Sequence, residues 1–300
     1  MINYITYSDL AKDVRENIWK IPHDIDVVLS IPRSGLIPGI MIAEYFNIPI
    51  TTVDNLVKTG NIEDSLLGNG RRLICKKEIN GEKPKKKILV VDDTFYSGAG
   101  MKEAQEKLKN FDYDFVYLVV YTENPKIPKN IIYFRDISLY GALSSFVFAK
   151  VSIFEWNLFH HGMLSEILYD IDGVIFNDPP DERNEEAYLN YIKNPIPKFI
   201  PQDLSNKCLN FATYRLNKYR DITYNSLQNV GIKIGHLYMF NAENYNQRNI
   251  TQAPYIYKGI IFKEHEEYKL FVESDDYQAQ FIHNISGKPV LSIEKNIVYN

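Results

Sequence analysis

The segment ILVVDDTFYSGAG, Ile88 to Gly100, is the most informative part of this 300-residue chain. Four apolar residues precede two adjacent carboxylates, Asp92 and Asp93, and a hydroxyl- and glycine-rich stretch then leads into the helical pattern MKEAQEKLKN. This order predicts a buried parallel strand, a loop over 94–100 and a helix over 101–110. Backbone N–H groups at such a helix N-terminus bind phosphate, and acids beside them can hold sugar hydroxyls. The segment therefore predicts a site for a ribose 5-phosphate.

The composition is that of a globular protein and sets bounds on function. The length predicts two domains, and 45% apolar and 24% charged residues are ordinary values. A net charge of −4 gives no reason to expect a nucleic-acid partner. The N-terminus lacks the apolar core of a signal peptide, and the absence of a run of about 18 apolar residues predicts no transmembrane segment. Cys75 and Cys208 lie far apart, which fits a reducing compartment, so we expect a cytoplasmic protein.

A second strand-to-helix turn lies earlier in the chain. The strand pattern DVVLS is followed by IPRSGLIPG and by an apolar helix pattern over 37–46. Arg33 supplies positive charge, and the backbone N–H groups of Arg33, Ser34 and Gly35 would point at an anion. A plain connection explains this turn equally well when it is taken alone. Beside the acidic motif downstream, we favour anion binding.

Together the two segments resemble the PRPP-binding domain of type I phosphoribosyltransferases, where PRPP is 5-phosphoribosyl 1-pyrophosphate. The family motif is an apolar strand, two acids, three variable residues, Thr or Ser, Gly, a small residue and Thr. Asp92, Asp93, Ser97 and Gly98 fit it, whereas Gly100 stands where a hydroxyl is common. The resemblance implies that the two acids hold the ribose hydroxyls and that one segment binds the 5-phosphate. That segment is Thr94, Phe95, Tyr96, Ser97, Gly98, Ala99 and Gly100.

Residues 57–87 form an unusually long connection that is rich in glycine and strongly basic at its end. In the resembled family a mobile loop in this region closes over PRPP, which implies that Arg71 and Arg72 reach the pyrophosphate beside Arg33. Strand patterns downstream, FVYLVVYT and IIYFRD, predict a mostly parallel sheet. The aromatic run VSIFEWNLFHHGM after them is either an acceptor platform or core packing, and we favour the core.

The second half begins with another apolar strand that ends in acids, EILYDIDG. Asp170 and Asp172 are two residues apart, so an extended chain directs both to one side, as a nucleophile and an acid–base partner require. The segment resembles the first motif of the HAD phosphatase superfamily, DxDG. This resemblance implies that Asp170 forms an aspartyl phosphate and that Asp172 acts as general acid and then as base. It also implies Mg²⁺ as the cofactor.

Downstream residues resemble the remaining motifs of that superfamily. Thr213 ends the pattern LNFAT and corresponds to the phosphate-binding hydroxyl, and Arg215 is a candidate to assist it. Lys258 is the first candidate for the motif lysine and Lys263 is its rival. Glu273 ends the pattern LFVES, in the position of the acidic fourth motif. The implied metal ligands are Asp170, Asp172, Glu273 and one of Asp275 and Asp276, with Asp275 preferred.

The two resemblances cover nearly the whole chain. They imply an α/β protein of two Rossmann-like domains with mainly parallel sheets: a phosphoribosyltransferase-like domain at 1–164 and a HAD-like phosphatase domain at 165–300. The acidic and proline-rich stretch over 177–206 reads as a small cap. We expect transfer of ribose 5-phosphate from PRPP to a sugar hydroxyl with inversion, giving a β-ribofuranoside, and then Mg²⁺-dependent removal of the 5-phosphate. The chain resembles tandem proteins of bacterial capsule and O-antigen biosynthesis, which implies a surface-glycan acceptor.

Two other functions stay open. A nucleobase phosphoribosyltransferase, for orotate or a purine, could carry an attached nucleotide phosphatase. A regulatory protein that binds PRPP is the third reading, which the catalytic pattern of the second half disfavours. Asp93 is the candidate base for the transfer step. The sequence is compatible with an oligomer and leaves its state open.

Overall fold

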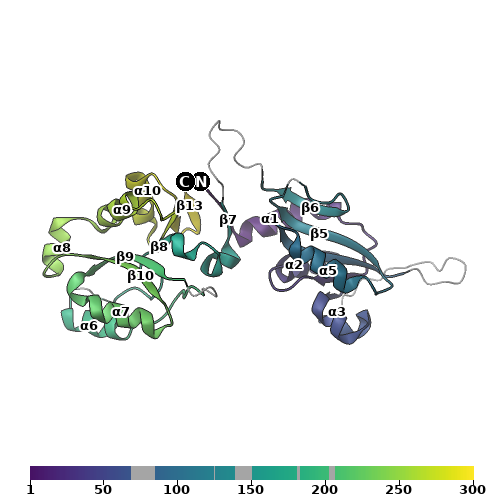
Figure 1. The fold of residues 1–300 in the computed structure, drawn as a ribbon, viewed down its shortest axis with the longest axis horizontal. Coiled ribbons are helices and arrows are strands. Elements are labelled where there is room, and N and C mark those ends of the chain that lie inside the picture. Colours follow the sequence, from purple (N-terminus) through teal and green to yellow (C-terminus); the bar gives the residue numbers. More distant parts are fainter. Residues whose placement is uncertain (69–84, 125, 139–150, 181–182, 203–206) are drawn as a thin grey trace, which may run out of the picture. The chain divides into compact units, whose positions relative to one another are not determined.

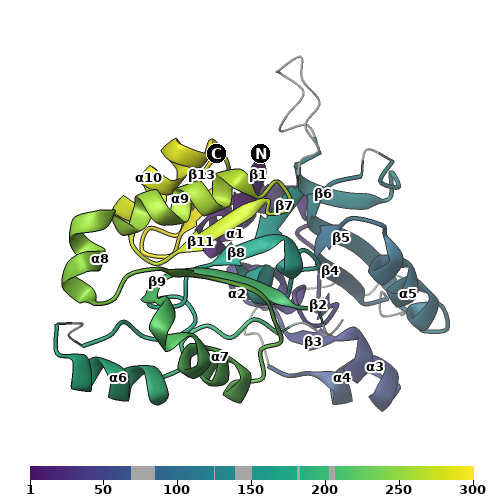
Figure 2. The same cartoon turned by 60° about the vertical axis from the view of Figure 1, so that its left-hand side comes forward.

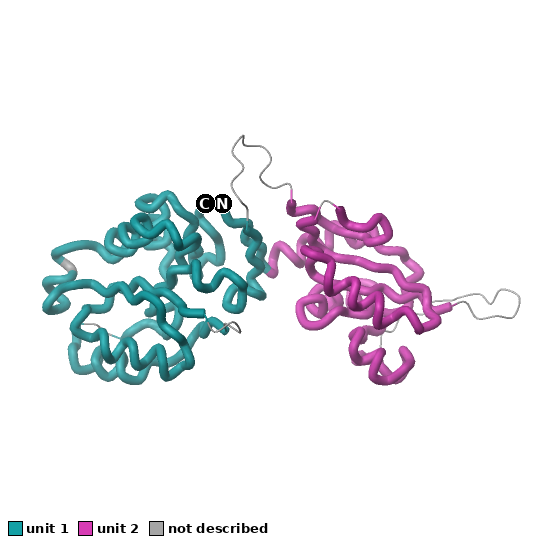
Figure 3. Tube along the Cα trace, in the orientation of Figure 1, with its two compact units in different colours: residues 1–6, 148–300 teal, residues 7–147 magenta. Residues whose placement is uncertain are grey.

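The structure is a computed structural model that describes residues 1–68, 85–124, 126–138, 151–180, 183–202 and 207–300. The chain forms two compact units, an N-terminal unit of residues 7–147 and a C-terminal unit of residues 1–6 and 148–300 (Figure 3). This division differs from the expected boundary at 164–165. Strand β1 (Ile2–Ile5) pairs in parallel with β7 (Val151–Phe154), and both strands belong to the C-terminal unit. No helix in the described part of the chain is long and apolar enough to span a membrane.

The N-terminal unit contains a five-stranded parallel sheet in the order β3-β2-β4-β5-β6. Its elements are α1 (Tyr7–Asn17), η1 (Ile18–Lys20), β2 (Val27–Ser30), α2 (Leu36–Phe46), β3 (Ile50–Thr52), α3 (Val53–Thr59), α4 (Ile62–Ser65), β4 (Lys87–Phe95), α5 (Ala99–Leu108), β5 (Asp114–Thr122) and β6 (Ile131–Asp136) (Figure 1). From β2 the chain winds outward to β3, and from β4 it winds the other way. The switch point of this doubly wound sheet therefore lies between β2 and β4, where such folds bind ligands.

Side chains alternate between the two faces of this sheet because the strand period is two residues. Val27 and Leu29 of β2 pack in one core cluster with residues of α3 and α5. Val28, between them, is fully buried but lies outside that cluster. Helices α1 and α2 contact each other, and so do α3 and α5. The apolar strands are thus covered on both faces, which leaves their carboxyl ends as the open edge.

The C-terminal unit has a six-stranded sheet in the order β10-β9-β8-β11-β12-β13. Besides β1 and β7, its elements are η2 (Glu155–His160), η3 (Leu164–Glu166), β8 (Ile167–Tyr169), α6 (Glu185–Lys193), β9 (Leu209–Leu216), η4 (Asn217–Tyr219), α7 (Arg220–Asn229), β10 (Ile234–Phe240), α8 (Tyr245–Thr251), α9 (Pro254–Glu264), β11 (Leu270–Glu273), α10 (Asp276–Ser286), β12 (Val290–Ser292) and β13 (Ile297–Tyr299). Strands β8 to β12 pair in parallel, and β12 and β13 are antiparallel. The prediction of mainly parallel sheets is therefore confirmed. The switch point lies between β8 and β11.

Two core clusters cover the faces of this second sheet. Leu168 and Phe271 pack with residues of α9 and α10, which lie side by side in Figure 2. Tyr169 and Val272, their chain neighbours, pack in the other cluster. That cluster also contains Ile153, so the aromatic run of residues 151–163 contributes to the core, as favoured from the sequence. The termini of the chain meet here, since the backbone N–H of Ile2 donates to Asn300 Oδ1 at 2.7 Å.

Candidate functional site

The two phosphate-binding segments predicted in the N-terminal unit meet at its switch point. Backbone N–H of Ile31, after β2, donates to the carbonyl of Val91 in β4 at 2.8 Å. A Cβ on Gly35 would lie 2.5 Å from the Ile31 carbonyl oxygen and 2.8 Å from that of Val91, so only glycine permits this close approach. Ser34 Oγ then donates to Asp93 Oδ1 at 2.8 Å. The structure thus joins the Arg33 turn to the twin aspartates.

The aspartate pair carries unusual electrostatics. Asp93 is buried, and its backbone N–H donates to Asp92 Oδ1 at 2.9 Å. Burial, followed by the negative charge of Asp93, raises the pKa of Asp92 to about 8. Adjacent carboxylate oxygens are the donors that Mg²⁺ prefers, and a divalent cation would offset the repulsion between them. Asp92 and Asp93 therefore fit a cation that arrives with an anionic ligand.

The 5-phosphate segment differs in part from its prediction. Strand β4 runs through Thr94 and Phe95, because its ladder with β5 extends to the pair Phe95 and Thr122, so these two residues are not in the loop. The Phe95 side chain is buried in the core and lies under Gly98, where a Cβ would meet the ring at 2.5 Å. Gly98 has φ of +78°, and α5 begins directly after it at Ala99 rather than at residue 101.

Of the remaining predicted ligands, several present their atoms at the surface. Exposed residues of the two segments are Arg33, Tyr96, Ser97, Ala99 and Gly100. Ser97 Oγ accepts from the Ala99 N–H at 3.3 Å, which helps to cap the start of α5. The Thr94 hydroxyl is buried, and within the described residues it has no hydrogen-bond partner. Arg71 and Arg72 lie outside the described residues.

The second candidate site lies at the switch point of the C-terminal unit. Lys258 of α9 is buried, and its Nζ donates to Asp170 Oδ2 at 2.6 Å and to Glu273 Oε2 at 2.8 Å. Burial favours the neutral amine, but the charges of Asp170 and Glu273 outweigh it and raise the pKa of Lys258. Lys263, the rival candidate, is exposed. The structure therefore places Lys258 against Asp170.

Asp170 opens into a cavity of about 680 Å³. Its Oδ1 accepts from the Ile171 N–H at 2.8 Å, so the carboxylate is held by backbone and by Lys258. Burial raises the pKa of Asp170 well above its usual value, and the Lys258 ammonium opposes that rise. The same cavity is lined by Asp172, Thr213, Ser274 and Asp275, with Thr213 almost fully buried. An anion there would meet the Lys258 ammonium and the hydroxyls of Thr213 and Ser274 beside the Asp170 carboxylate.

Asp172 forms a buried ion pair that the sequence did not predict. Arg215 Nε donates to Asp172 Oδ2 at 2.9 Å and Arg215 Nη2 to Asp172 Oδ1 at 2.6 Å. Tyr191 of α6 adds a hydroxyl that donates to Oδ1 at 2.6 Å. Burial would raise the pKa of Asp172, but the charge and hydrogen bonds of Arg215 hold it below its usual value. Asp172 is therefore a carboxylate at neutral pH, which suits a base better than an acid.

The predicted metal ligands do not assemble into one cluster. Glu273 is fully buried and accepts from Lys258 and from the backbone N–H of Ser274. Asp275 caps α10, accepting from the Gln278 N–H at 2.7 Å. With Asp172 bound to Arg215, no group of three or more carboxylate, histidine or cysteine side chains in the described residues is placed to hold a metal ion. The arrangement does not fit the predicted magnesium site.

Sequence reasoning missed two residues of this second site. Tyr191 bonds to Asp172, and Gln278 accepts from Lys258 Nζ at 3.2 Å. Neither lies in a motif, and both are brought in by helices that follow the strands. The position of Arg215 could be predicted from the sequence, because residues two apart on a strand share a face and Thr213 is the predicted phosphate-binding residue.

One comparison with known proteins concerns the N-terminal unit. Residues 4–137 match the model of the phosphoribosyl transferase domain family. The match includes the whole five-stranded sheet of the N-terminal unit and supports a phosphoribosyltransferase domain, and hence a transferase, at these residues. A search of curated proteins returned no match.

Several solved structures are similar to part of the chain. A purine phosphoribosyltransferase from Pyrococcus horikoshii is 14% identical, with 52% of this chain and 93% of that chain covered and a TM-score of 0.33. An orotate phosphoribosyltransferase from Aeropyrum pernix is 20% identical, with 39% and 57% covered and a TM-score of 0.27. A xanthine-guanine-hypoxanthine phosphoribosyltransferase from Helicobacter pylori is 15% identical, with 53% and 93% covered and a TM-score of 0.28.

Proposed function

We propose that the chain transfers ribose 5-phosphate from PRPP to a sugar hydroxyl of a glycan acceptor and then hydrolyses the 5-phosphate ester. The N-terminal unit performs the transfer and the C-terminal unit, acting as a HAD-type phosphatase, performs the hydrolysis. The observation that carries this proposal is the pair of switch points. One lies in the matched phosphoribosyl transferase domain and holds Asp92 and Asp93. The other holds Asp170 against Lys258, with Thr213 in the same cavity.

In the transfer step, the ribose hydroxyls of PRPP lie against Asp92 and Asp93, and the backbone around Gly98 receives the 5-phosphate. Arg33 balances the charge of the pyrophosphate. The bond from C1 to pyrophosphate breaks, and the acceptor oxygen forms a new bond to C1 on the opposite face. The acceptor proton passes to a carboxylate, for which Asp93 is the candidate. Mg²⁺ bound with PRPP would be held by the aspartate pair and would neutralise the pyrophosphate charge.

In the hydrolysis step, an Asp170 oxygen attacks phosphorus and the ester oxygen leaves, taking a proton from solvent. Lys258 and Thr213 hold the phosphoryl oxygens. Water then attacks the aspartyl phosphate, and Asp172 accepts the proton of that water. Asp170 is restored as a carboxylate and inorganic phosphate departs. Arg215 keeps Asp172 ionised for this second half of the reaction.

The proposed removal of the 5-phosphate favours one class of acceptor over the other. A nucleotide-forming enzyme gains nothing from dephosphorylating its product, whereas a glycan that contains plain ribofuranose requires it. A glycan intermediate of the capsule or O-antigen type is therefore the proposed acceptor, and a cytoplasmic location is proposed because PRPP is made there. The nucleobase alternative predicts an ultraviolet-absorbing product from PRPP and a base.

The test follows phosphorus by NMR in reactions of PRPP with Mg²⁺ and a panel of monosaccharide glycosides and nucleobases. The wild-type chain should release pyrophosphate and inorganic phosphate. The variant Asp170→Asn should release pyrophosphate and accumulate a phosphomonoester. Inorganic phosphate from that variant at the wild-type rate would rule out Asp170 as the nucleophile. A product formed with a nucleobase and no sugar would replace the glycan acceptor with the nucleobase.

A further inference from the structure

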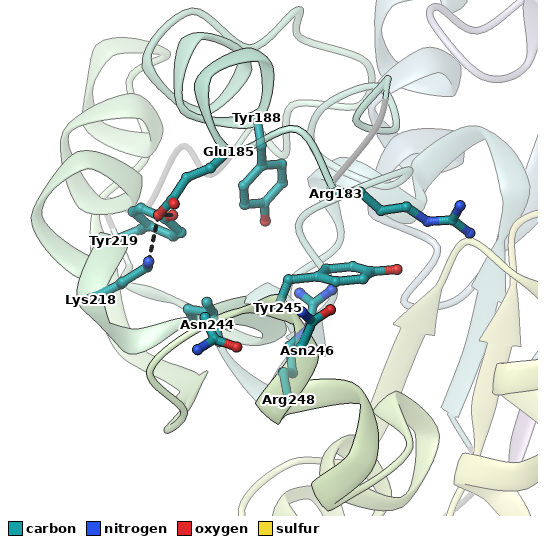
Figure 4. A pocket seen from close by; sticks show the side chains of 10 residues that line it. Arg183, Glu185, Tyr188, Lys218, Tyr219, Asn244, Tyr245, Asn246 and Arg248 are labelled. Atoms are coloured by element: carbon teal, nitrogen blue, oxygen red, sulfur yellow. Dashed lines mark hydrogen bonds and ion pairs between the residues drawn. The ribbon is translucent and has the colours of Figure 1, made fainter.

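A second cavity adjoins the phosphate cavity of the C-terminal unit. It has a volume of about 350 Å³, toward the lower end of the roughly 300–1,000 Å³ typical of small-molecule sites. Helix α6, the turn η4 after β9 and the start of α8 surround it (Figure 4). Tyr245 and Arg183 line both this cavity and the one that holds Asp170. The two cavities are therefore neighbours, and an ester whose phosphate sits at Asp170 would reach the second cavity past Tyr245 and Arg183.

The lining of this cavity suits a polyhydroxylated ring. Glu185 accepts from Lys218 Nζ at 2.6 Å and from the Tyr219 hydroxyl at 2.8 Å. An acid beside an ammonium matches two neighbouring hydroxyls, because one side chain accepts a hydrogen bond and the other donates. On the opposite wall (Figure 4), the Asn246 amide can do both, whereas the Asn244 oxygen accepts from the Gln247 N–H at 3.0 Å and leaves the Asn244 NH2 group as a donor. Polar groups of both kinds thus surround the space.

Apolar surface completes the match. Leu216 and the ring of Tyr245 give flat or aliphatic contacts, against which the C–H faces of a sugar pack. Tyr188 of α6 also lines the cavity (Figure 4). The charge of Lys218 is balanced by Glu185, whereas Arg183 and Arg248 add two further cations to the lining.

A nucleobase fits this lining less well. Bases are held by stacking on open aromatic faces. The guanidinium of Arg248 lies 5.0 Å from the ring centre of Tyr245 and covers one of its faces, so a ligand meets a single open face of this ring. Tyr188 stacks on Tyr191 at 6.2 Å and meets Tyr219 edge-on at 5.8 Å. Among the described lining residues, the tyrosines therefore offer edges and hydroxyls more than a pair of facing rings.

We propose that this second cavity binds the sugar to which the phosphorylated ribosyl group has been attached. The C-terminal unit would then dephosphorylate a ribosyl glycoside phosphate in preference to free ribose 5-phosphate or a nucleotide. This inference rests on the proposed phosphatase function. It also gives α6 two roles, since Tyr188 faces the sugar cavity and Tyr191, one turn on, bonds to Asp172.

The experiment measures phosphate release from three defined esters: ribose 5-phosphate, uridine 5′-monophosphate and a methyl galactoside that carries β-ribofuranosyl 5-phosphate. The wild-type chain should hydrolyse the galactoside ester with a kcat/KM about tenfold or more above the other two. Asn246→Trp fills the cavity and should reduce that ratio below about twofold, mainly through KM. Asn246→Ala should reduce it less. Asn229→Trp, on an exposed position at the end of α7, is the matched control and should keep the wild-type ratio.

The outcomes separate the two proposals. Release from no ester would overturn the phosphatase function and this inference with it. Equal kcat/KM for the galactoside ester and ribose 5-phosphate would leave the proposed phosphatase activity standing and overturn the proposal that the second cavity binds a sugar. A preference for uridine 5′-monophosphate that Asn246→Trp removes would assign the cavity to a nucleobase instead. Far-ultraviolet circular dichroism of each variant identifies a folding failure, and Asn246→Ala then carries the comparison.

Discussion

Replacing Arg215 with Met tests the buried ion pair that holds Asp172. The Arg215 side chain is fully buried and that of Asp172 is 16% exposed, so the substitution leaves a largely buried carboxylate without its cation. Breaking one partner of such a pair costs about 3–5 kcal/mol. Because Asp172 keeps the bond from Tyr191 and some access to water, we expect about 3 kcal/mol, at the lower end.

Urea unfolding measures this loss in the full chain. The chain has two tryptophans, and Trp19 is exposed in the N-terminal unit, whereas Trp156 stacks on Phe154 in the C-terminal unit. In a Trp19→Phe background, fluorescence therefore reports the C-terminal unit alone. With a urea slope of about 2 kcal/mol per molar, Arg215→Met should lower the midpoint by about 1.5 M.

Two further variants make this prediction refutable. Arg220→Met removes an exposed arginine of α7 whose Nε donates to Asn217 Oδ1 at 2.8 Å, and it should change stability by less than about 0.5 kcal/mol. Adding Asp172→Asn to Arg215→Met should recover part of the loss, because the orphaned charge is gone. A midpoint for Arg215→Met equal to that of Arg220→Met would refute the buried ion pair.

Other predictions follow from the two switch points. Gly35→Ala should lower the stability of the N-terminal unit by about 1–3 kcal/mol, because the new Cβ would collide with two backbone carbonyls. Gly68→Ala is the control, because a Cβ there meets nothing within 4 Å. Equal unfolding midpoints for the two variants would contradict this prediction. The Asp92 pKa of about 8 predicts that PRPP affinity rises with pH up to about 8 and then becomes constant, because the ionised carboxylate binds. Asp93→Asn should weaken this pH dependence. Calorimetry from pH 6.5 to 9 measures the affinity, and a flat profile for the wild type would exclude a role for Asp92 ionisation. Lys258→Met should abolish phosphate release and lower the Trp156 midpoint, since two buried carboxylates lose their shared cation; an unchanged midpoint would argue against that bridge.

Much of the fold was readable from the sequence because its signals are local. Apolar runs ending in acids marked β4 and β8, and the alternation of strands with helical patterns predicted parallel sheets, which the structure confirms. Both switch points lie beside the acids that the sequence predicts at the ends of β4 and β8. The reason is general: carboxyl ends of neighbouring parallel strands share one edge.

The differences come from contacts that are distant in sequence. Strand β1 pairs with β7, and the register of Ile2 with Val151 spans nearly half the chain, so composition gave no hint of the observed unit boundary. The extension of β4 through Phe95 depends on its ladder with β5. Tyr191 and the sugar cavity arise from packing of α6 against the end of β9, where Tyr188 and Leu216 share a cluster. Such tertiary packing overrides what a motif alone can indicate.

Calorimetric titration of PRPP with Mg²⁺ into the full chain asks whether the aspartate pair of the N-terminal unit holds PRPP. We expect one PRPP per chain for the wild type, a loss of about tenfold or more in affinity for Asp92→Asn combined with Asp93→Asn, and wild-type affinity for Asp112→Asn, an exposed aspartate before β5. Absence of PRPP binding to the wild-type chain, or equal affinity in the double variant, would contradict the account.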